Sequence, residues 1–266
     1  MNKANSTQNS IILFFGSLGR WFLGAIERMG DATVLSASSL AHLFARPWQG
    51  KHIVLQLYAL GVGSFVIIAI TGAFTGMVLS LQGYYTLAKF GSESLLGSGV
   101  ALAIIRELGP VLGAFMMVGR AGSSITAEIG IMRVTEQLDA LQMMATNPKA
   151  RVILPRIIAM IIALPLLVSM FDIIGLGAGY VVGVELLGVN GGAFVGEMVA
   201  KITPMDLYAG WVKALGFGIL IGVICTYMGY RATPTTEGVA KATTQAVVAG
   251  SVGVLVLDYI LTSFFL

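Results

Sequence analysis

The chain has 266 residues, a mean hydropathy of +0.87 and only 11% charged residues, whereas soluble domains are nearer to a quarter charged. This composition excludes an ordinary soluble globular protein, and a net charge of +3 is too small to suggest a nucleic-acid partner. The single cysteine, Cys225, lies in an apolar run and implies neither a disulfide nor a metal site.

Residues 1–50 are predicted to form an N-terminal tail and a helix on the membrane surface. From Ile11 to Met29, apolar residues recur at helical spacing, while Arg20 and Glu27 fall on the opposite side. Such a helix is too charged to span a bilayer, so we expect it to lie in the interface plane. A signal peptide is disfavoured because the basic n-region and the small-residue cleavage site are missing.

Residues 51–266 are predicted to form an all-α, polytopic domain of five transmembrane helices, because apolar runs of twenty or more residues recur. A polar segment at 119–151 separates the second span from the third, and a Gly-rich loop at 185–207 separates the third from the fourth. Gly72 and Gly76 in the first span form a G-x-x-x-G pattern, which is typical of close helix packing. The expected spans cover about residues 53–81, 97–118, 152–184, 208–228 and 244–266.

The distribution of Lys and Arg predicts the orientation. Twelve of these residues lie before the first span, around the 119–151 segment or in the 229–243 loop, whereas the other side has only Lys89 and Lys201. Because cytoplasmic loops carry the excess of positive charge, we expect a cytoplasmic N-terminus, a cytoplasmic 119–151 segment and a periplasmic C-terminus.

Five charged residues fall inside the expected spans: Arg106, Glu107, Asp172, Lys213 and Asp258. A charge at a helix centre costs about 2.5–3.5 kcal/mol or more, so these side chains should face the protein interior or a water-filled cavity. One interpretation is a set of ion pairs that pack the bundle. The other is a polar cavity open to the outside, where the cations Arg106 and Lys213 favour an anionic ligand.

The 119–151 segment carries a more regular pattern of apolar and acidic residues than a plain linker needs. An apolar stripe at helical spacing is predicted from Ile131 onward, with acidic residues opposite it and Met143 and Met144 outside it. Because Met is an adaptable contact residue, this pattern favours a docking surface for another protein over a plain solvated loop. The stripe comprises Ile131, Val134, Leu138, Leu141 and Ala145, and the acids are Glu128, Glu136 and Asp139.

Motifs for catalysis are missing from the sequence. It contains no G-x-x-x-x-G-K-[ST], so we expect no ATP bound by a P-loop of this chain. It also lacks H-E-x-x-H, G-x-S-x-G and any cluster of Cys and His. The expected protein is therefore not an enzyme, and it needs no cofactor of its own.

The run from Arg106 to Pro148, together with GYRATPTTEGVAKATTQAVV at 229–248, resembles the MlaE (YrbE) family of permeases. These are membrane subunits of Mla-type ABC transporters, and the resemblance covers nearly the whole chain. It implies a homodimer in a Gram-negative inner membrane that moves phospholipid between the inner and outer membranes and maintains outer-membrane lipid asymmetry. It also implies three further partners: a dimer of a separate ATPase that binds ATP, a STAS-domain subunit and a periplasmic ring of MCE-domain subunits.

The resemblance also implies roles for two sets of residues. The 119–151 segment would couple to the ATPase, and the membrane charges would line a phospholipid cavity. From the residues themselves, we expect Arg106 to bind the phosphate and Glu107 to hold Arg106 when lipid is absent, either within one chain or across the dimer. The coupling residues would be Glu128, Arg133, Glu136, Gln137, Asp139 and Met143. The cavity residues would be the charged Arg106, Glu107 and Lys213, with Leu79, Leu81 and Leu108 as apolar walls.

Two other classes of function stay open from the residues alone. A secondary transporter or channel would usually show internal repeats and more spans, and no convincing repeat is visible here. A membrane anchor or assembly scaffold would need no transport pathway. Co-purification of a separate ATPase distinguishes an ABC permease from both.

Overall fold

The computed structural model describes residues 23, 27, 30–35, 38 and 50–265, and within them it contains helices and no strand. Five helical segments are long and apolar enough to cross a membrane, as the sequence predicted. They are Gly50–Ala88 (α2), Glu93–Val134, Lys149–Leu186, Pro204–Tyr230 (α9) and Thr236–Phe265 (α10). The predicted interfacial helix at Ile11–Met29 lies almost entirely outside the described residues, whereas residues 30–35 are helical.

The second and third spans are composite helices that contain π-helical turns. Such turns insert an extra residue into the helix and occur often at functional sites. The second span runs through η2 (Glu93–Leu95), α3 (Leu96–Ala103), η3 (Ile104–Leu108), α4 (Gly109–Met117), η4 (Val118–Gly122) and α5 (Ser123–Val134). The third runs through η5 (Lys149–Ile153), α7 (Leu154–Tyr180) and η6 (Val181–Leu186). Of these, η2 is a 3₁₀ turn and η3, η4, η5 and η6 are π-helical.

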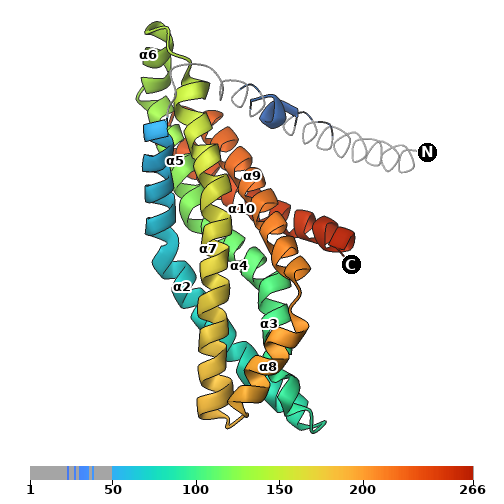
Figure 1. Ribbon diagram of the computed structural model, residues 1–266. Helices are drawn as coiled ribbons and strands as arrows, with labels where there is room; N and C mark the ends of the chain where they lie inside the picture. The colour runs from blue at the N-terminus through green and yellow to red at the C-terminus, as the bar shows by residue number, and fades with distance from the viewer. Residues whose placement is uncertain (1–22, 24–26, 28–29, 36–37, 39–49, 266) are drawn as a thin grey trace, which may run out of the picture.

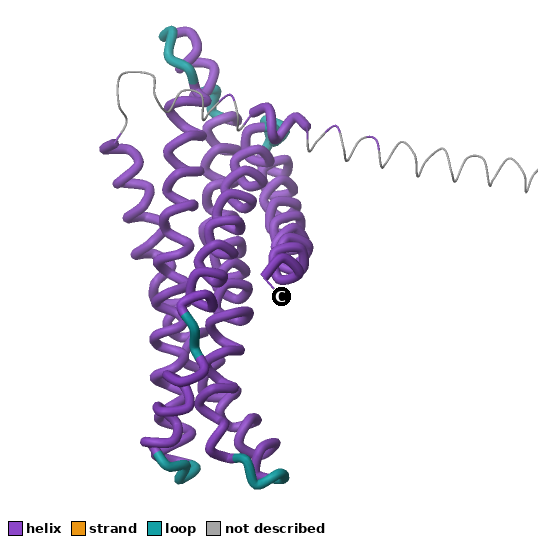
Figure 2. The backbone as a smooth tube through the Cα atoms, turned by 45° about the vertical axis from the view of Figure 1, so that its right-hand side comes forward, coloured by secondary structure: helices purple, strands orange, loops and turns teal. Residues whose placement is uncertain are grey.

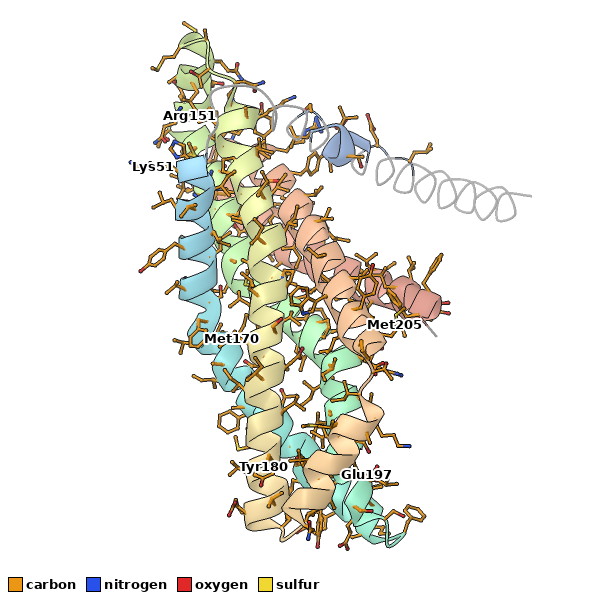
Figure 3. The ribbon with its side chains drawn as sticks, viewed as in Figure 1. Lys51, Arg151, Met170, Tyr180, Glu197 and Met205 are labelled. Atoms are coloured by element: carbon orange, nitrogen blue, oxygen red, sulfur yellow. The ribbon has the colours of Figure 1, made fainter. Side chains whose placement is uncertain are left out.

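The helices form a bundle with distinct ends (Figure 1). Lys51 and Arg151 lie near the end that carries α6 (Gln137–Met143), and Tyr180 and Glu197 lie near the opposite end (Figure 3). The first three spans have 38 to 42 residues, against 27 and 30 for α9 and α10. Consequently the C-terminus stops part-way along the bundle, level with the start of α9, while α2, α3 and α7 extend further (Figures 1 and 2).

The pair α2 and α7 packs through glycines, which confirms the close-packing face predicted from Gly72 and Gly76. A Cβ added at Gly76 would lie 1.9 Å from the carbonyl oxygen of Gly175, and one at Gly72 would lie 2.9 Å from that of Phe171. The two backbones are therefore too close for any side chain at these positions, and the seam holds the first span against the third.

The Gly-rich loop expected at 185–207 contains a helix, α8 (Gly191–Lys201). Asn190 caps it by accepting a hydrogen bond from the backbone N–H of Ala193 at 3.0 Å. Phe194 of α8 is buried and meets the Tyr180 ring edge to face at 5.6 Å. The many glycines around this segment lower its helix propensity and therefore favoured the prediction of a loop. Asn190 directly before it is nevertheless a recognisable N-cap.

The 119–151 segment also differs from the expected single helical stripe. The helix of the second span continues to Val134, breaks at Thr135 and Glu136, and restarts as α6. Glu136 adopts φ 56°, a left-handed conformation that a continuous helix does not allow. The predicted stripe is therefore split: Leu138 is buried, but Ile131 is 53% exposed.

We expect Gly76→Ala to destabilise the bundle by about 1–3 kcal/mol, because the new methyl group overlaps the Gly175 backbone and cannot be relieved by a rotamer change. The matched control is Gly61→Ala in the same helix, where nothing lies within 4 Å of the added Cβ. Thermal unfolding of both variants in detergent measures the difference. Equal transition midpoints would mean that the α2–α7 seam tolerates separation.

Candidate functional site

A buried ammonium group joins three of the five spans. Lys213 of α9 is 2% exposed, and its three N–H bonds are all used. Nζ donates to Glu107 Oε2 at 2.7 Å, to Thr262 Oγ1 of α10 at 2.7 Å and to the carbonyl oxygen of Arg106 at 3.0 Å. Asp258 Oδ1 lies 3.2 Å away as an additional ion-pair contact that lacks its own hydrogen bond.

The bond from Lys213 to the Arg106 carbonyl has a cause in the sequence. In an α-helix this carbonyl would accept from the N–H four residues later, but Pro110 occupies that position and has no N–H. Pro110 removes the donor that α-helical geometry would give this carbonyl, and Lys213 donates to it instead. Gly210 permits this close approach, because a Cβ there would lie 2.7 Å from the Ile105 carbonyl oxygen.

A second ion pair lies beside the first. Arg106 donates from Nε to Asp206 Oδ1 at 2.6 Å, and its Nη2 lies 2.5 Å from the same oxygen. Asp206 Oδ2 accepts from the backbone N–H and the hydroxyl of Thr203, which completes a capping box at the start of α9. Asp206 is thus fixed by its own helix terminus, and it orients Arg106.

These two ion pairs line a pocket of about 130 Å³. The side chain of Arg106 is 46% exposed, whereas those of Asp206 and Lys213 are 4% and 2% exposed, so Arg106 is the cation that a ligand can reach. Arg106 Nη1 makes no hydrogen bond within the described residues. The pocket is lined by Arg106, Glu107, Thr203, Met205, Asp206, Ala209, Lys213, Thr262 and Phe265.

The structure brings Arg106, Glu107 and Lys213 together, but with different pairings from those expected. Glu107 binds Lys213 rather than Arg106, because it projects from η3 toward α9 and α10. Asp206 was missed by the sequence analysis, although Thr203-Pro-Met-Asp206 has the spacing of a capping box and points to a helix start. Asp172 lies apart from this cluster: its Oδ1 packs against Gly109 and makes no hydrogen bond.

The three leucines expected as apolar walls do not surround the charged pocket within one protomer. Leu79 lines a separate pocket of about 300 Å³ between α2 and α3, together with Leu87 and Leu96. Leu81 and Leu108 line neither pocket. The reason is the arrangement of the spans: α2 packs on α3 and α7, whereas the charged cluster faces α9 and α10.

The predicted coupling residues separate into two groups. Glu128 and Arg133 are tied into the bundle: Glu128 Oε2 accepts from Arg156 Nη2 at 3.0 Å, and Arg133 Nη1 donates to the Tyr230 carbonyl at 2.7 Å. Glu136, Gln137 and Asp139 are exposed on and before α6. Met143 and Met144 beside them are 90% and 74% exposed, so α6 presents apolar and acidic groups at the tip of the molecule.

Comparison with known proteins relates nearly the whole of this architecture to one family. The family described as Permease MlaE matches residues 53–264. The chain is 42% identical to the intermembrane phospholipid transport system permease protein MlaE of Haemophilus influenzae, over 95% of this chain and 97% of that protein. It is 39% identical to a probable ABC transporter permease protein of Rickettsia felis, over 94% and 96% respectively. It is also 32% identical to the chloroplastic protein TRIGALACTOSYLDIACYLGLYCEROL 1 of Arabidopsis thaliana, over 81% and 61%.

We expect Lys213→Ala to destabilise the protein by about 3–5 kcal/mol, because it leaves two carboxylates inside the bundle without their cation. The matched control combines Lys213→Ala with Glu107→Gln and Asp258→Asn, which removes the unpaired charges as well. Thermal unfolding should show that the triple variant recovers part of the loss. A triple variant less stable than the single one would contradict this account of the cluster.

Proposed function

The chain belongs to the MlaE permease family, and on this premise we propose that it is the membrane subunit of an ABC transporter that moves phospholipids between the inner and outer membranes of a Gram-negative envelope. The name of the Haemophilus influenzae relative supports the substrate class, and maintenance of outer-membrane lipid asymmetry is the role that follows from it. The five spanning helices fit a multi-pass protein of the inner membrane.

The observation that carries this proposal is the half-exposed Arg106 in a pocket inside a membrane protein. A phospholipid phosphate is an anion that an Arg guanidinium can bind through two N–H groups at once. Arg106 keeps Nη1 and part of Nη2 free for such a ligand, because Asp206 occupies the Nε side. Lys213 contributes positive charge from behind the pocket but no direct contact, since its donors are all used.

The acyl chains need apolar walls, and the pocket between α2 and α3 offers them. It has a volume of about 300 Å³ and lies against the same composite span as Arg106, one turn or more toward the α8 end. Leu79 lines it, in agreement with a role in holding lipid, and Leu87, Leu96 and Val100 add further apolar surface.

We further propose that α6 and the residues before it bind the ATPase that drives transport. Exposed apolar side chains in a water-facing segment mark an interaction site, and Met143 and Met144 are 90% and 74% exposed. Relatives described as ABC transporter permeases support an ATPase partner, which would bind ATP in place of this chain. Glu128 and Arg133 would then transmit force from this segment into α7 and α9 rather than touch the ATPase.

The remaining assembly follows from family membership. We propose a homodimer, as the family resemblance implies, and the exposed apolar surfaces of α2 and α10 are available to a second copy as well as to lipid. A STAS-domain subunit on the ATPases and an MCE-domain ring on the periplasmic side complete the proposed transporter. A secondary transporter or a scaffold is the competing proposal, and neither explains the exposed methionines at the α6 end.

Arg106→Gln combined with Asp206→Asn should lower the phospholipid retained by the purified protein about tenfold, since a hydrogen bond to a charged group contributes on that order. The double change removes the cation without leaving Asp206 unpaired. The control is Asp206→Asn alone. It keeps Arg106, and its side-chain oxygen can still accept the hydrogen bond from the Thr203 N–H in the capping box. Mass spectrometry of extracted lipid measures retention, and equal amounts in both variants would sink the proposed lipid site.

Reversing two charges with Glu136→Arg and Asp139→Arg should release the ATPase or uncouple ATP hydrolysis from lipid, while the permease still folds. The matched control is Glu136→Asn with Asp139→Asn, which removes the charges while Asn tolerates the left-handed backbone at position 136. Co-purification and lipid-stimulated ATPase activity are the measurements. Normal stimulated activity after charge reversal would rule out this surface as the coupling element.

A further inference from the structure

A second arginine of the same span has no carboxylate partner. Arg106, Lys213 and Arg156 each pair with an acidic side chain, but within the described residues Arg120 pairs with none. Arg120 lies in the π-helical turn η4, fourteen residues after Arg106, which is about 21 Å along a helix toward the α6 end. Arg120 is exposed and lies where the sequence predicts that the second span leaves the membrane, so its guanidinium is at a depth where lipid headgroups lie.

The contacts of Arg120 hold one edge of its guanidinium and leave the other edge free. Nη1 donates to the carbonyl oxygen of Ala59 at 3.2 Å and to the Ser64 hydroxyl at 3.0 Å, both on α2. Nε and Nη2 make no hydrogen bond within the described residues. The Nε–Nη2 edge is a planar fork of the kind that binds two oxygens of one phosphate.

Gly63 of α2 provides the space in which this guanidinium lies. A Cβ at Gly63 would lie 2.2 Å from Nη2 and 2.5 Å from Nη1, so any larger residue would displace the group. Arg120 nevertheless stays exposed, and Gly119 beside it has nothing within 4 Å of an added Cβ. The guanidinium is therefore positioned by α2 and open on its outer side.

We propose that Arg120 binds the phosphate of a phospholipid in the leaflet next to the α6 end, as a second headgroup site on the same span as Arg106. This inference rests on the proposed function, because it assumes that phospholipid reaches the protein surface between α2 and η4. The headgroup is held by the free fork of Arg120, and the acyl chains extend along α2 toward the membrane centre, past Ile67. The second span would then carry two headgroup sites, fourteen residues apart along the chain.

The experiment places a photo-crosslinking amino acid at Ile67, which is 41% exposed and one turn beyond Gly63 on α2. The protein is reconstituted in nanodiscs with acyl-labelled phosphatidylglycerol, or with diacylglycerol that carries the same labelled chains and lacks the phosphate. In otherwise wild-type protein we expect phosphatidylglycerol to be captured about tenfold more than diacylglycerol, and Arg120→Gln to abolish this preference. Arg120→Lys should keep part of it, because the charge remains but the fork is lost.

Two further crosslinking positions serve as controls. Tyr58 lies about 140° around α2 from Gly63 at 100° per residue, so its capture of bulk lipid should not depend on Arg120. Met205 lines the pocket of Arg106, so its capture of phosphatidylglycerol tests the proposed function separately.

The outcomes separate the two ideas. Capture at Met205 with no phosphate preference at Ile67 overturns the Arg120 site and leaves the proposed function intact. Absence of capture at both positions overturns the proposed function as well. The comparison of the two lipids uses unaltered Arg120, so it decides the question even if the Arg120→Gln variant does not fold.

Discussion

The hydrogen bonds of Lys213 are the interaction on which the arrangement of the second span, α9 and α10 depends. An ammonium group that is 2% exposed inside a bundle must have every donor satisfied, and Lys213 meets this condition with three acceptors. Two of these acceptors belong to η3 of the second span and one to α10. The single side chain therefore fixes the mutual rotation of three spans, and the helices cannot turn independently without exposing a charge to hydrocarbon.

This constraint also decides which charge is available to a ligand. Because Lys213 takes Glu107 and lies beside Asp258, the nearby Arg106 must find its partner elsewhere, and it finds Asp206 at the beginning of α9. Asp206 already accepts two hydrogen bonds from Thr203, so its position is set by the helix terminus. Arg106 is thereby held in one orientation while about half of its side chain stays exposed. It can therefore bind an anion without losing its contact with Asp206.

The sequence predicted that the charges within the spans would face the protein interior or a cavity, but not how they pair. Hydropathy locates the spans, and the cost of a charge in hydrocarbon makes Arg106, Glu107, Lys213 and Asp258 inward-facing wherever they lie. Pairing depends on helix rotation, and the π-helical turn η3 changes that rotation with no signal beyond Pro110. The break at Thr135 and Glu136 was equally hidden, since neither residue is the Gly or Pro that usually marks one. By contrast, Asn190 before α8 and Thr203-x-x-Asp206 before α9 are recognisable helix caps within the segment that was predicted to be a Gly-rich loop.

The second span connects the pocket of Arg106 to the segment that precedes α6. Two of its arginines, Arg106 and Arg120, each lie in a π-helical turn, where the extra residue turns the side chain away from the direction that a regular helix would give it. Beyond them, α5 is held to α7 through Glu128 and Arg156, and to the end of α9 through Arg133. The same helix that orients Arg106 in the pocket thus ends at the segment that precedes α6. Arg106 and Arg120 therefore lie on the same composite helix as the residues that anchor the segment before α6, although the break at Thr135 and Glu136 separates α6 itself from that helix.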